Sequence, residues 1–343
     1  MKIISVSKNK NFIKFNQLSL IFPSGKKLRM PGCSILAHLL CHFRIFVRLL
    51  RLEPRCAAFI SDDVVVLSFR RKLWYVSIKD ARIIKTENLR CGFSDVLSFC
   101  STEGNVYYGD YGQNPTGKEI NIYRITESLS SEVCYTFPSG TIKHVHNIIF
   151  DRYRERYFIF TGDFGEKIGI YETNKDFSEV KPFLLGQQCY RAVVGKVLEK
   201  GLLYATDAVM EENNIIYIPF ESKMPRQIKS LNGSVIYGIE TEKGLLLSTT
   251  VEPYPSTKSR IVSLLSNRRG LGIKSDAVDV VYVDESFEAN VMATYRKDVL
   301  PMRLFQYGAV MFPAYCRKPQ SDVYINPISV KKYDGKIVRL SIL

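Results

Sequence analysis

Short runs of apolar residues recur along most of the chain after residue 56. They are rich in Val, Ile, Tyr and Phe, and Gly, Asn, Asp and Ser separate them, as in "AAFISDDVVVLSFRRKLWYVSIKD". Short runs of this composition between turn residues are typical of β-strands. The absence of a second amphipathic helical pattern argues against a protein of alternating strands and helices.

Residues 34–55, "SILAHLLCHFRIFVRLLRLEPR", show a helical period instead. Apolar residues recur there at spacings of three and four, Ser34 is suited to cap the N-terminus, and Pro54 ends the pattern. Arg44 and Arg48 would lie at a high energetic cost inside a membrane span. The pattern therefore favours an amphipathic helix packed on the body of the fold, and a basic helix lying on a membrane surface is the alternative.

Four segments repeat one arrangement: a turn, a strand and an acidic residue near the end of the strand. They are "GNVYYGDYG", "ERYFIFTGDFG", "KGLLYATDAV" and "KGLLLSTTVEP". Their acids, Asp110, Asp163, Asp207 and Glu252, are 53, 44 and 45 residues apart. A repeat of roughly 40 to 50 residues with four strands has the size of a propeller blade. The sequence therefore predicts an all-β propeller of six blades, with seven as the alternative.

Three parts make up the predicted organisation. Residues 1–33 supply strands that are candidates to complete the last blade and close the ring, which would remove open sheet edges. Residues 34–55 form the helix, and residues 56–343 form the propeller.

Polar residues are expected to converge at one end of the axial channel. Neighbouring strands run antiparallel, so the four acids share a face with the residues that open each innermost strand. Those openings hold two histidines in "HVHNIIFD", a cluster in "QQCYRAVV" and another in "LFQYG". The residues concerned are His144, His146, Gln188, Tyr190, Arg191, Gln306 and Tyr307.

Two chemistries fit this set. Two of the four acids could cleave a glycosidic bond, while Arg191 holds a sugar carboxylate and the Gln and Tyr residues contact the rest of the substrate. Alternatively, His144 and His146, with Asp163 and Gln306, could hold a divalent metal that polarises a uronate for β-elimination. A purely structural role is the competing interpretation of each residue, because Asp at a strand end commonly bonds a turn.

Charge and cysteine content narrow the partners and the compartment. The net charge of +14, from 48 basic and 34 acidic residues, favours polyanionic partners such as an acidic glycan or anionic lipid. Nucleic acid is not expected, because zinc-finger spacing and the aromatic RNA-binding signature are missing. The eight cysteines form no C-x-x-C pair, and the N-terminal residues lack an apolar signal-peptide core. These features predict a reducing cytoplasm.

The outer strands "IYRITESLSSEVCYTF" and "IYETNKDFSEVKPF" resemble the Asp-box turn of sialidase-like (BNR) propellers, without its glycine and tryptophan. The order "GDYGQN", "HVHNIIFD", "FTGDF", "GQQCYRAV", "ATDAVMEEN", "TTVEP" and "FQYGAVMFP" resembles an uncharacterised group of microbial six-bladed propellers over about residues 36 to 312. The resemblance implies site roles for the residues already named and adds Tyr111, Asn114, Asp151, Glu211 and Asn213. Of these, Asn114 is the further candidate for substrate binding.

The resulting hypothesis is a carbohydrate-related propeller that acts on an acidic glycan as a hydrolase or lyase. The alternative is a non-catalytic propeller that binds a glycan or a protein in polysaccharide metabolism. Peripheral membrane contact through residues 34–55 is compatible with either hypothesis.

Overall fold

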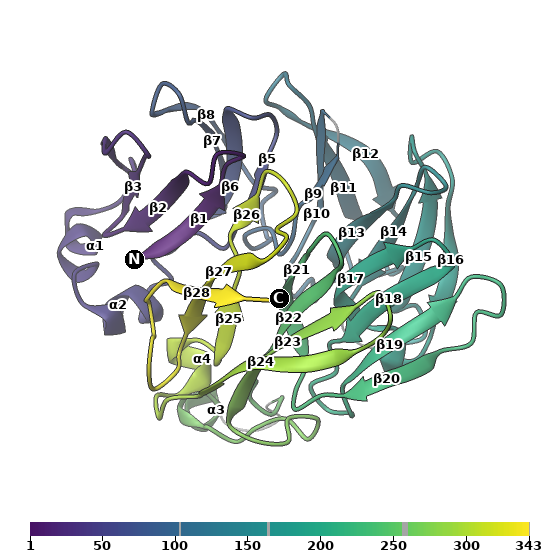
Figure 1. Ribbon diagram of the computed structural model, residues 1–343. Helices are drawn as coiled ribbons and strands as arrows, with labels where there is room; N and C mark the ends of the chain where they lie inside the picture. Colours follow the sequence, from purple (N-terminus) through teal and green to yellow (C-terminus); the bar gives the residue numbers. More distant parts are fainter. Residues whose placement is uncertain (103, 163–164, 256–259, 343) are drawn as a thin grey trace.

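Seven small sheets lie in a circle around a central axis (Figure 1). The computed structural model describes residues 1–102, 104–162, 165–255 and 260–342. The chain is an all-β propeller of seven blades, so the predicted fold class is confirmed, with the alternative blade number.

Five blades are antiparallel sheets of four strands in simple chain order, with the first strand of each nearest the axis. Their strands are β5 (Cys56–Phe59), β6 (Val64–Phe69), β7 (Lys72–Ser77) and β8 (Arg82–Asn88); β9 (Cys100–Thr102), β10 (Asn105–Gly109), β11 (Ile120–Ile125) and β12 (Ser131–Phe137); β13 (Val145–Asp151), β14 (Arg156–Thr161), β15 (Gly169–Asn174) and β16 (Val180–Leu185); β17 (Ala192–Leu198), β18 (Gly201–Thr206), β19 (Asn214–Pro219) and β20 (Arg226–Ser230); and β21 (Val235–Glu240), β22 (Gly244–Thr249), β23 (Ala277–Asp284) and β24 (Ala289–Arg296). The four repeated segments of the sequence form the second strand of their blades, β10, β14, β18 and β22.

The N-terminal strands form a blade of their own. It contains β1 (Lys2–Val6), β2 (Phe12–Asn16), β3 (Ser19–Ile21) and β4 (Lys27–Arg29), and its innermost strand is β26 (Ala314–Tyr315), which pairs in parallel with β1. The last blade has three strands, β25 (Ala309–Met311), β27 (Asp322–Ile328) and β28 (Val338–Ser341). The ring therefore closes where a strand from late in the chain joins the N-terminal sheet, and this extra blade raises the number from six to seven.

The predicted helix of residues 34–55 forms two short helices, α1 (Ile35–Leu40) and α2 (Arg44–Leu49). Ser34 caps α1 as expected, because its Oγ accepts a hydrogen bond from the Ala37 amide at 3.1 Å. The extended backbone of Phe43 separates the helices. The remaining helices are a 3-10 turn at η1 (Gln188–Tyr190), α3 (Arg260–Leu265) and α4 (Met302–Phe305). Among the described residues, no helix is long and apolar enough to cross a membrane.

The hydrophobic core lies between neighbouring blades. Leu203, Leu247 and Val281 belong to one such layer, which joins β18, β22 and β23, and all three are at most 1% exposed. A missing side chain allows close approach near the axis, because a Cβ at Gly109 would lie 2.4 Å from the Cβ of Val145. This tight packing fixes the ends of the inner strands, and with them the polar residues placed there.

Candidate functional site

The openings of the innermost strands and the ends of the second strands meet at one end of the axis, as the antiparallel order requires. We call this cluster the polar mouth. It comprises Arg55 before β5, Tyr111 after β10, His144 and His146 at the start of β13, Arg191 before β17, Asp207 after β18, Tyr237 on β21, Glu252 after β22 and Tyr307 before β25.

The two histidines lie together in the buried part of the polar mouth. Each is 3% exposed, and their rings stack with centroids 5.0 Å apart. Nδ1 of His144 lies 2.6 Å from the Gly112 carbonyl oxygen, and Nδ1 of His146 lies 2.9 Å from that of Ala192. A carbonyl oxygen only accepts, so each Nδ1 carries a hydrogen that it donates to the carbonyl.

Both Nε2 atoms point to the same place. An added Cβ at Gly162 would lie 2.0 Å from Nε2 of His146 and 2.5 Å from that of His144. Burial lowers the pKa of His146 well below 6.5, and the nearby His144 and Arg191 lower it further. The His146 imidazole is therefore neutral at pH 7, with its lone pair on Nε2.

A buried ion pair joins the histidines to the next blade. Arg191 donates to Asp207 over 3.1 Å, and the two residues are 7% and 3% exposed. The same Asp207 oxygen lies 3.8 Å from Nδ1 of His146. Arg191 and Asp207, both predicted, are thus brought together as a buried ion pair.

Arg55 and Tyr111 form the opposite side of the polar mouth. The Arg55 guanidinium lies over the Tyr111 ring at 4.5 Å from its centroid, and that ring is 4.7 Å from His144 and 6.3 Å from His146, measured between centroids. Burial opposes the charge of Arg55, but Tyr111 and Tyr237 outweigh it, so the pKa of Arg55 is raised. Arg55 is therefore protonated and positively charged.

Glu252 lies close to two tyrosines of the polar mouth, Tyr237 and Tyr307. One of its oxygens accepts hydrogen bonds from Ser234 and from Thr250, the latter at 2.9 Å. Burial raises the pKa of Tyr237 and of Tyr307, and the charge of Glu252 contributes to both shifts, as Tyr111 does. Glu252 and Tyr307 are therefore placed together, as the sequence predicted.

Other predicted site residues have partners that hold the fold. The Asp110 carboxylate accepts from Arg90 at 2.9 Å and from the Asn121 amide at 3.0 Å, and burial raises its pKa. The Asn114 side chain closes its own loop through both the amide and the carbonyl of Lys118, each at 2.9 Å. These contacts are those of structural residues. They agree with the competing interpretation of the sequence, in which an acid at a strand end bonds a turn.

The remaining predicted residues are near the polar mouth or outside the described part. Gln188 and Tyr190 form η1 just before Arg191. Gln306 ends α4 with a φ of 74°, and its Oε1 is buried without a hydrogen-bond partner among the described residues. Asp163 lies outside the described residues.

Of the additional residues of the resemblance, Tyr111 lies in the polar mouth, whereas Asp151, Glu211 and Asn213 take fold-supporting positions. Asp151 accepts a hydrogen bond from Arg156 at the far end of β13, and the Asn213 side chain donates to the backbone carbonyls of Ala208, Glu211 and Gly272.

Sequence reasoning missed Arg51, Arg55 and Tyr237. Arg51 follows α2, and burial lowers its pKa while the neighbouring Tyr307 and Tyr237 oppose that shift. A signal for Arg55 was available, because it directly precedes an innermost strand, as Arg191 does. Arg51 has no such signal, because only the tertiary fold brings the end of α2 to the polar mouth.

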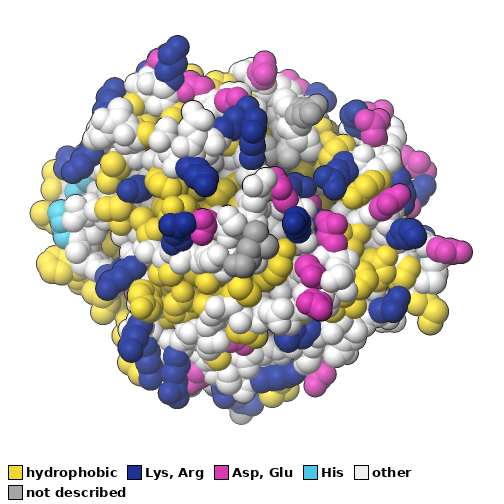
Figure 2. All heavy atoms as spheres, viewed as in Figure 1, with side chains coloured by type: hydrophobic (Ala, Val, Ile, Leu, Met, Phe, Trp, Pro, Cys, Tyr) yellow, Lys and Arg dark blue, Asp and Glu magenta, His cyan; other side chains and the backbone are white. Residues whose placement is uncertain are grey.

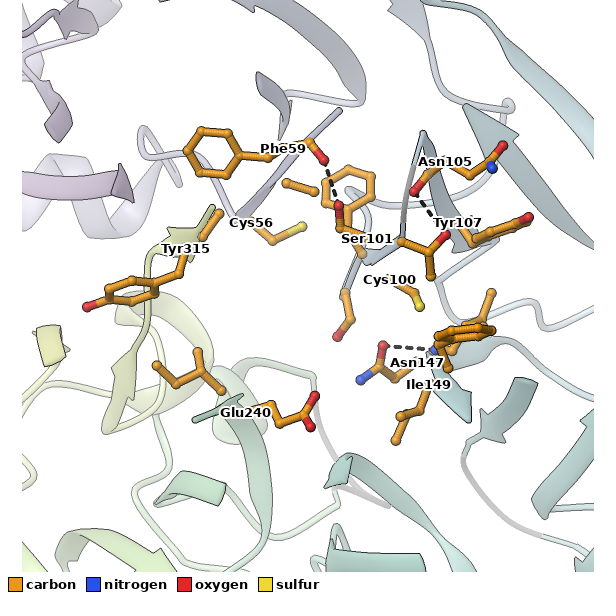
Figure 3. Close-up of a pocket in the computed structure, with 18 of the residues that line it drawn as sticks. Cys56, Phe59, Cys100, Ser101, Asn105, Tyr107, Asn147, Ile149, Glu240 and Tyr315 are labelled. Carbon is orange, nitrogen blue, oxygen red and sulfur yellow. Dashed lines mark hydrogen bonds between the residues drawn. The ribbon is translucent and has the colours of Figure 1, made fainter. Parts of the chain in front are cut away.

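A cavity of about 1740 Å³ runs along the axis below the polar mouth. Arg55 and Tyr237 line the cavity and also belong to the polar mouth, so the two meet at these residues. Polar and aromatic side chains from several blades surround the cavity, as Figure 3 shows for Cys56, Ser101, Tyr107, Asn147, Glu240 and Tyr315. A volume of this size is large enough for a ligand of several rings.

Comparison with known proteins supports the fold alone. No family model and no curated protein matches the chain. Among solved structures, a chain of the mitotic checkpoint complex aligns with a TM-score of 0.57 at 6% identity, covering 100% of this chain and 87% of that one. An oligogalacturonate lyase in complex with manganese has a TM-score of 0.47 at 10% identity, covering 82% and 74%. The extracellular domain of a putative one-component system from B. thetaiotaomicron has a TM-score of 0.48 at 10% identity, covering 84% and 33%. The resemblance to sialidase-like Asp-box propellers gains no support from these comparisons.

Proposed function

We propose that this propeller binds an acidic saccharide where its axial cavity meets the polar mouth, with Arg55 and Arg51 holding the sugar carboxylate. The observation that carries the proposal is the set of contacts that these two guanidinium groups make. Arg55 stacks on Tyr111 and donates to the Asp95 carbonyl, and Arg51 donates to the carbonyls of Arg48 and Arg303. Within the described residues, no carboxylate lies at ion-pair distance from either guanidinium, whereas Arg191 is paired with Asp207.

A carboxylate is the anion that this arrangement suits. A guanidinium binds a carboxylate through two parallel hydrogen bonds, and the tyrosine rings beside it offer faces for stacking on a sugar. The cavity admits a chain of sugar units, and Asn147 and Glu240 are among the polar residues that line it.

Of the two predicted chemistries, the geometry favours β-elimination over hydrolysis by two carboxylates. Asp110 is turned toward Arg90 and Asp207 is paired with Arg191, which leaves Glu252 as the described acid nearest to the tyrosines. A histidine Nε2 would take the proton next to the uronate carboxylate, and the released electron pair would form a ring double bond while the neighbouring glycosidic C–O bond breaks. The departing oxygen would take its proton from water or a tyrosine.

The test is a glycan array with product detection, containing uronate-bearing, sialylated and neutral glycans. The wild-type protein is expected to bind acidic glycans, and Arg55→Gln is expected to lose that binding while its thermal midpoint changes little. Arg82→Gln, an exposed arginine on β8, is the matched control and should bind as the wild type does. A neutral glycan preference, or equal binding by Arg55→Gln, would refute the proposal. An unsaturated product would identify a lyase, and binding without product would identify a non-catalytic binder.

A divalent metal at the histidine pair is the second proposal for the same site. It rests on the two converging Nε2 atoms, each oriented by an Nδ1–carbonyl contact of the kind found behind metal-binding histidines. Among the described residues, no group of three or more His, Cys, Asp or Glu is placed to hold a metal ion. Metal analysis of the purified wild type and of His144→Ala and His146→Ala tests this proposal, which fails if the wild type binds no divalent ion.

A further inference from the structure

The two N-terminal helices expose an apolar surface on the side of the molecule. Seven large apolar side chains between residues 35 and 50 are 36% to 82% exposed, out of nineteen such side chains among the described residues. We call them the α1–α2 surface: Ile35, Leu36, Leu39, Phe43, Ile45, Leu49 and Leu50. Figure 2 shows hydrophobic side chains together with the histidines at the left edge, over α1 and α2.

Other residues of α1 and α2 attach the helices to the body of the fold. Ala37 and Cys41 fill the core beneath α1, and α2 is held by buried Arg48, which pairs with Asp298 and donates to the Phe305 carbonyl at 2.8 Å. Arg44 adds ion pairs to Glu53 and Asp334. The helices are therefore fixed from below, whereas the side chains of the α1–α2 surface are 36% to 82% exposed to water. An exposed apolar patch of this kind on a soluble protein marks a contact surface.

The distribution of charged residues along the chain favours a negatively charged partner for this surface. Residues 1–60 contain eleven Lys or Arg and one Asp or Glu, whereas the other 283 residues contain 37 basic and 33 acidic residues. Most of the net charge of +14 therefore belongs to the N-terminal blade and its two helices. Lys26, Lys27 and Arg29 are exposed on and before β4, just ahead of α1. Burial raises the pKa of the Cys41 thiol and Arg29 opposes that shift, which places the Arg29 charge beside the end of α1.

We propose that the α1–α2 surface docks the protein on an anionic lipid bilayer. Leu, Ile and Phe side chains would enter the boundary between headgroups and acyl chains, while the neighbouring Lys and Arg would meet anionic headgroups. The short helices lie on the surface of the membrane and do not span it. The inference does not depend on the proposed saccharide site, although Arg51 at the end of α2 brings the two regions close together.

The test is co-sedimentation with vesicles of phosphatidylcholine alone and of phosphatidylcholine with phosphatidylserine. The wild type is expected to sediment with the anionic vesicles and much less with the neutral ones. The triple variant Leu36→Ser, Leu39→Ser and Phe43→Ser is expected to bind anionic vesicles at least tenfold more weakly. The matched control changes three exposed apolar residues elsewhere: Val133→Ser, Met224→Ser and Val291→Ser. It should bind as the wild type does.

Three results would overturn the proposal. The first is a wild type that stays in the supernatant with anionic vesicles. The second is unchanged binding by the triple variant together with loss of binding by Lys27→Gln and Arg29→Gln, which would indicate attraction to any polyanion. The third is a wild-type dimer in light scattering that the triple variant converts to a monomer, because a second copy would then cover the α1–α2 surface.

Discussion

The buried neutral histidine makes the stability of the propeller depend on pH. Burial, with His144 and Arg191 nearby, lowers the pKa of His146 well below 6.5, whereas in the unfolded chain the imidazole takes up a proton near its usual value. At acidic pH the unfolded state therefore binds one more proton than the folded state. The free energy of unfolding falls as the pH drops below about 6.5 and is unaffected by this group above it.

The size of the effect follows from this one proton. Well below the unfolded pKa, each pH unit lowers the free energy of unfolding by about 1.4 kcal/mol. Between pH 7.5 and pH 5.5 the total loss is also about 1.4 kcal/mol, because little of it occurs above the unfolded pKa of about 6.5. An unfolding entropy of about 2.1 cal/mol/K per residue gives about 0.7 kcal/mol/K for this chain. The His146 contribution therefore lowers the Tm by about 2 °C between these pH values.

Thermal unfolding of the wild type and of His146→Gln at both pH values measures this contribution. The variant is expected to lose about 2 °C less than the wild type on acidification, whatever its absolute Tm. His42→Gln is the matched control, because His42 is exposed and contacts Gln17 on the surface, and it should retain the wild-type dependence. An identical acid shift for His146→Gln and the wild type would show that the His146 imidazole is not kept neutral by the fold.

Two further substitutions test the geometry of the polar mouth. Gly162→Ala would place a Cβ 2.0 Å and 2.5 Å from the two Nε2 atoms, so we expect a stability loss of about 1–3 kcal/mol in chemical denaturation and loss of acidic-glycan binding. Gly112→Ala, whose Cβ would have contacts of 3.5 Å, should keep both properties, and a harmless Gly162→Ala would contradict the position of the histidines. Asp207→Asn removes the negative charge from the buried ion pair with Arg191 and should cost about 3–5 kcal/mol in a urea titration. Asp62→Asn, which removes the exposed pair with Lys8, should cost less than about 1 kcal/mol, and equal costs would refute the buried pairing.

Much of the fold was predictable because it repeats in the sequence. The period of four strands and the acid after each second strand locate β10, β14, β18 and β22, and the antiparallel order then brings His146, Arg191, Asp207 and Glu252 to one end. These placements depend on local patterns and on one rule of sheet geometry. They do not require knowledge of any contact between distant residues.

The blade number and the helix break depend on distant contacts. β26 has only two residues and pairs in parallel with β1. The repeat of strands along the sequence does not predict this pairing. In the same way, the break at Phe43 positions Arg44 and Arg48 against Asp334 and Asp298, far away in the sequence. The number of blades and the two-helix arrangement could therefore not be predicted from the periodicity of the sequence alone.

For the functional residues too, the sequence predicts position but not the contacts made with distant residues. Asp110 has the sequence position of a site acid, but its partner Arg90 comes from the preceding loop and turns the carboxylate into a structural group. Arg51 reaches the polar mouth only because α2 is anchored nearby. A residue type at a strand end predicts location, whereas the role depends on which partners the fold supplies.

The most direct test of an acidic-saccharide site is a pair of calorimetric titrations with one acidic glycan that binds on the array and with its methyl ester. The ester keeps the sugar but removes the charge that Arg55 and Arg51 are proposed to hold. A charge-assisted pair contributes about 1.5–3 kcal/mol, so the ester should bind roughly ten- to a hundredfold more weakly to the wild type. The preference for the acid over the ester should be smaller for Arg55→Gln than for the wild type, because only Arg51 remains to hold the charge. Equal affinity of the wild type for acid and ester would contradict the account.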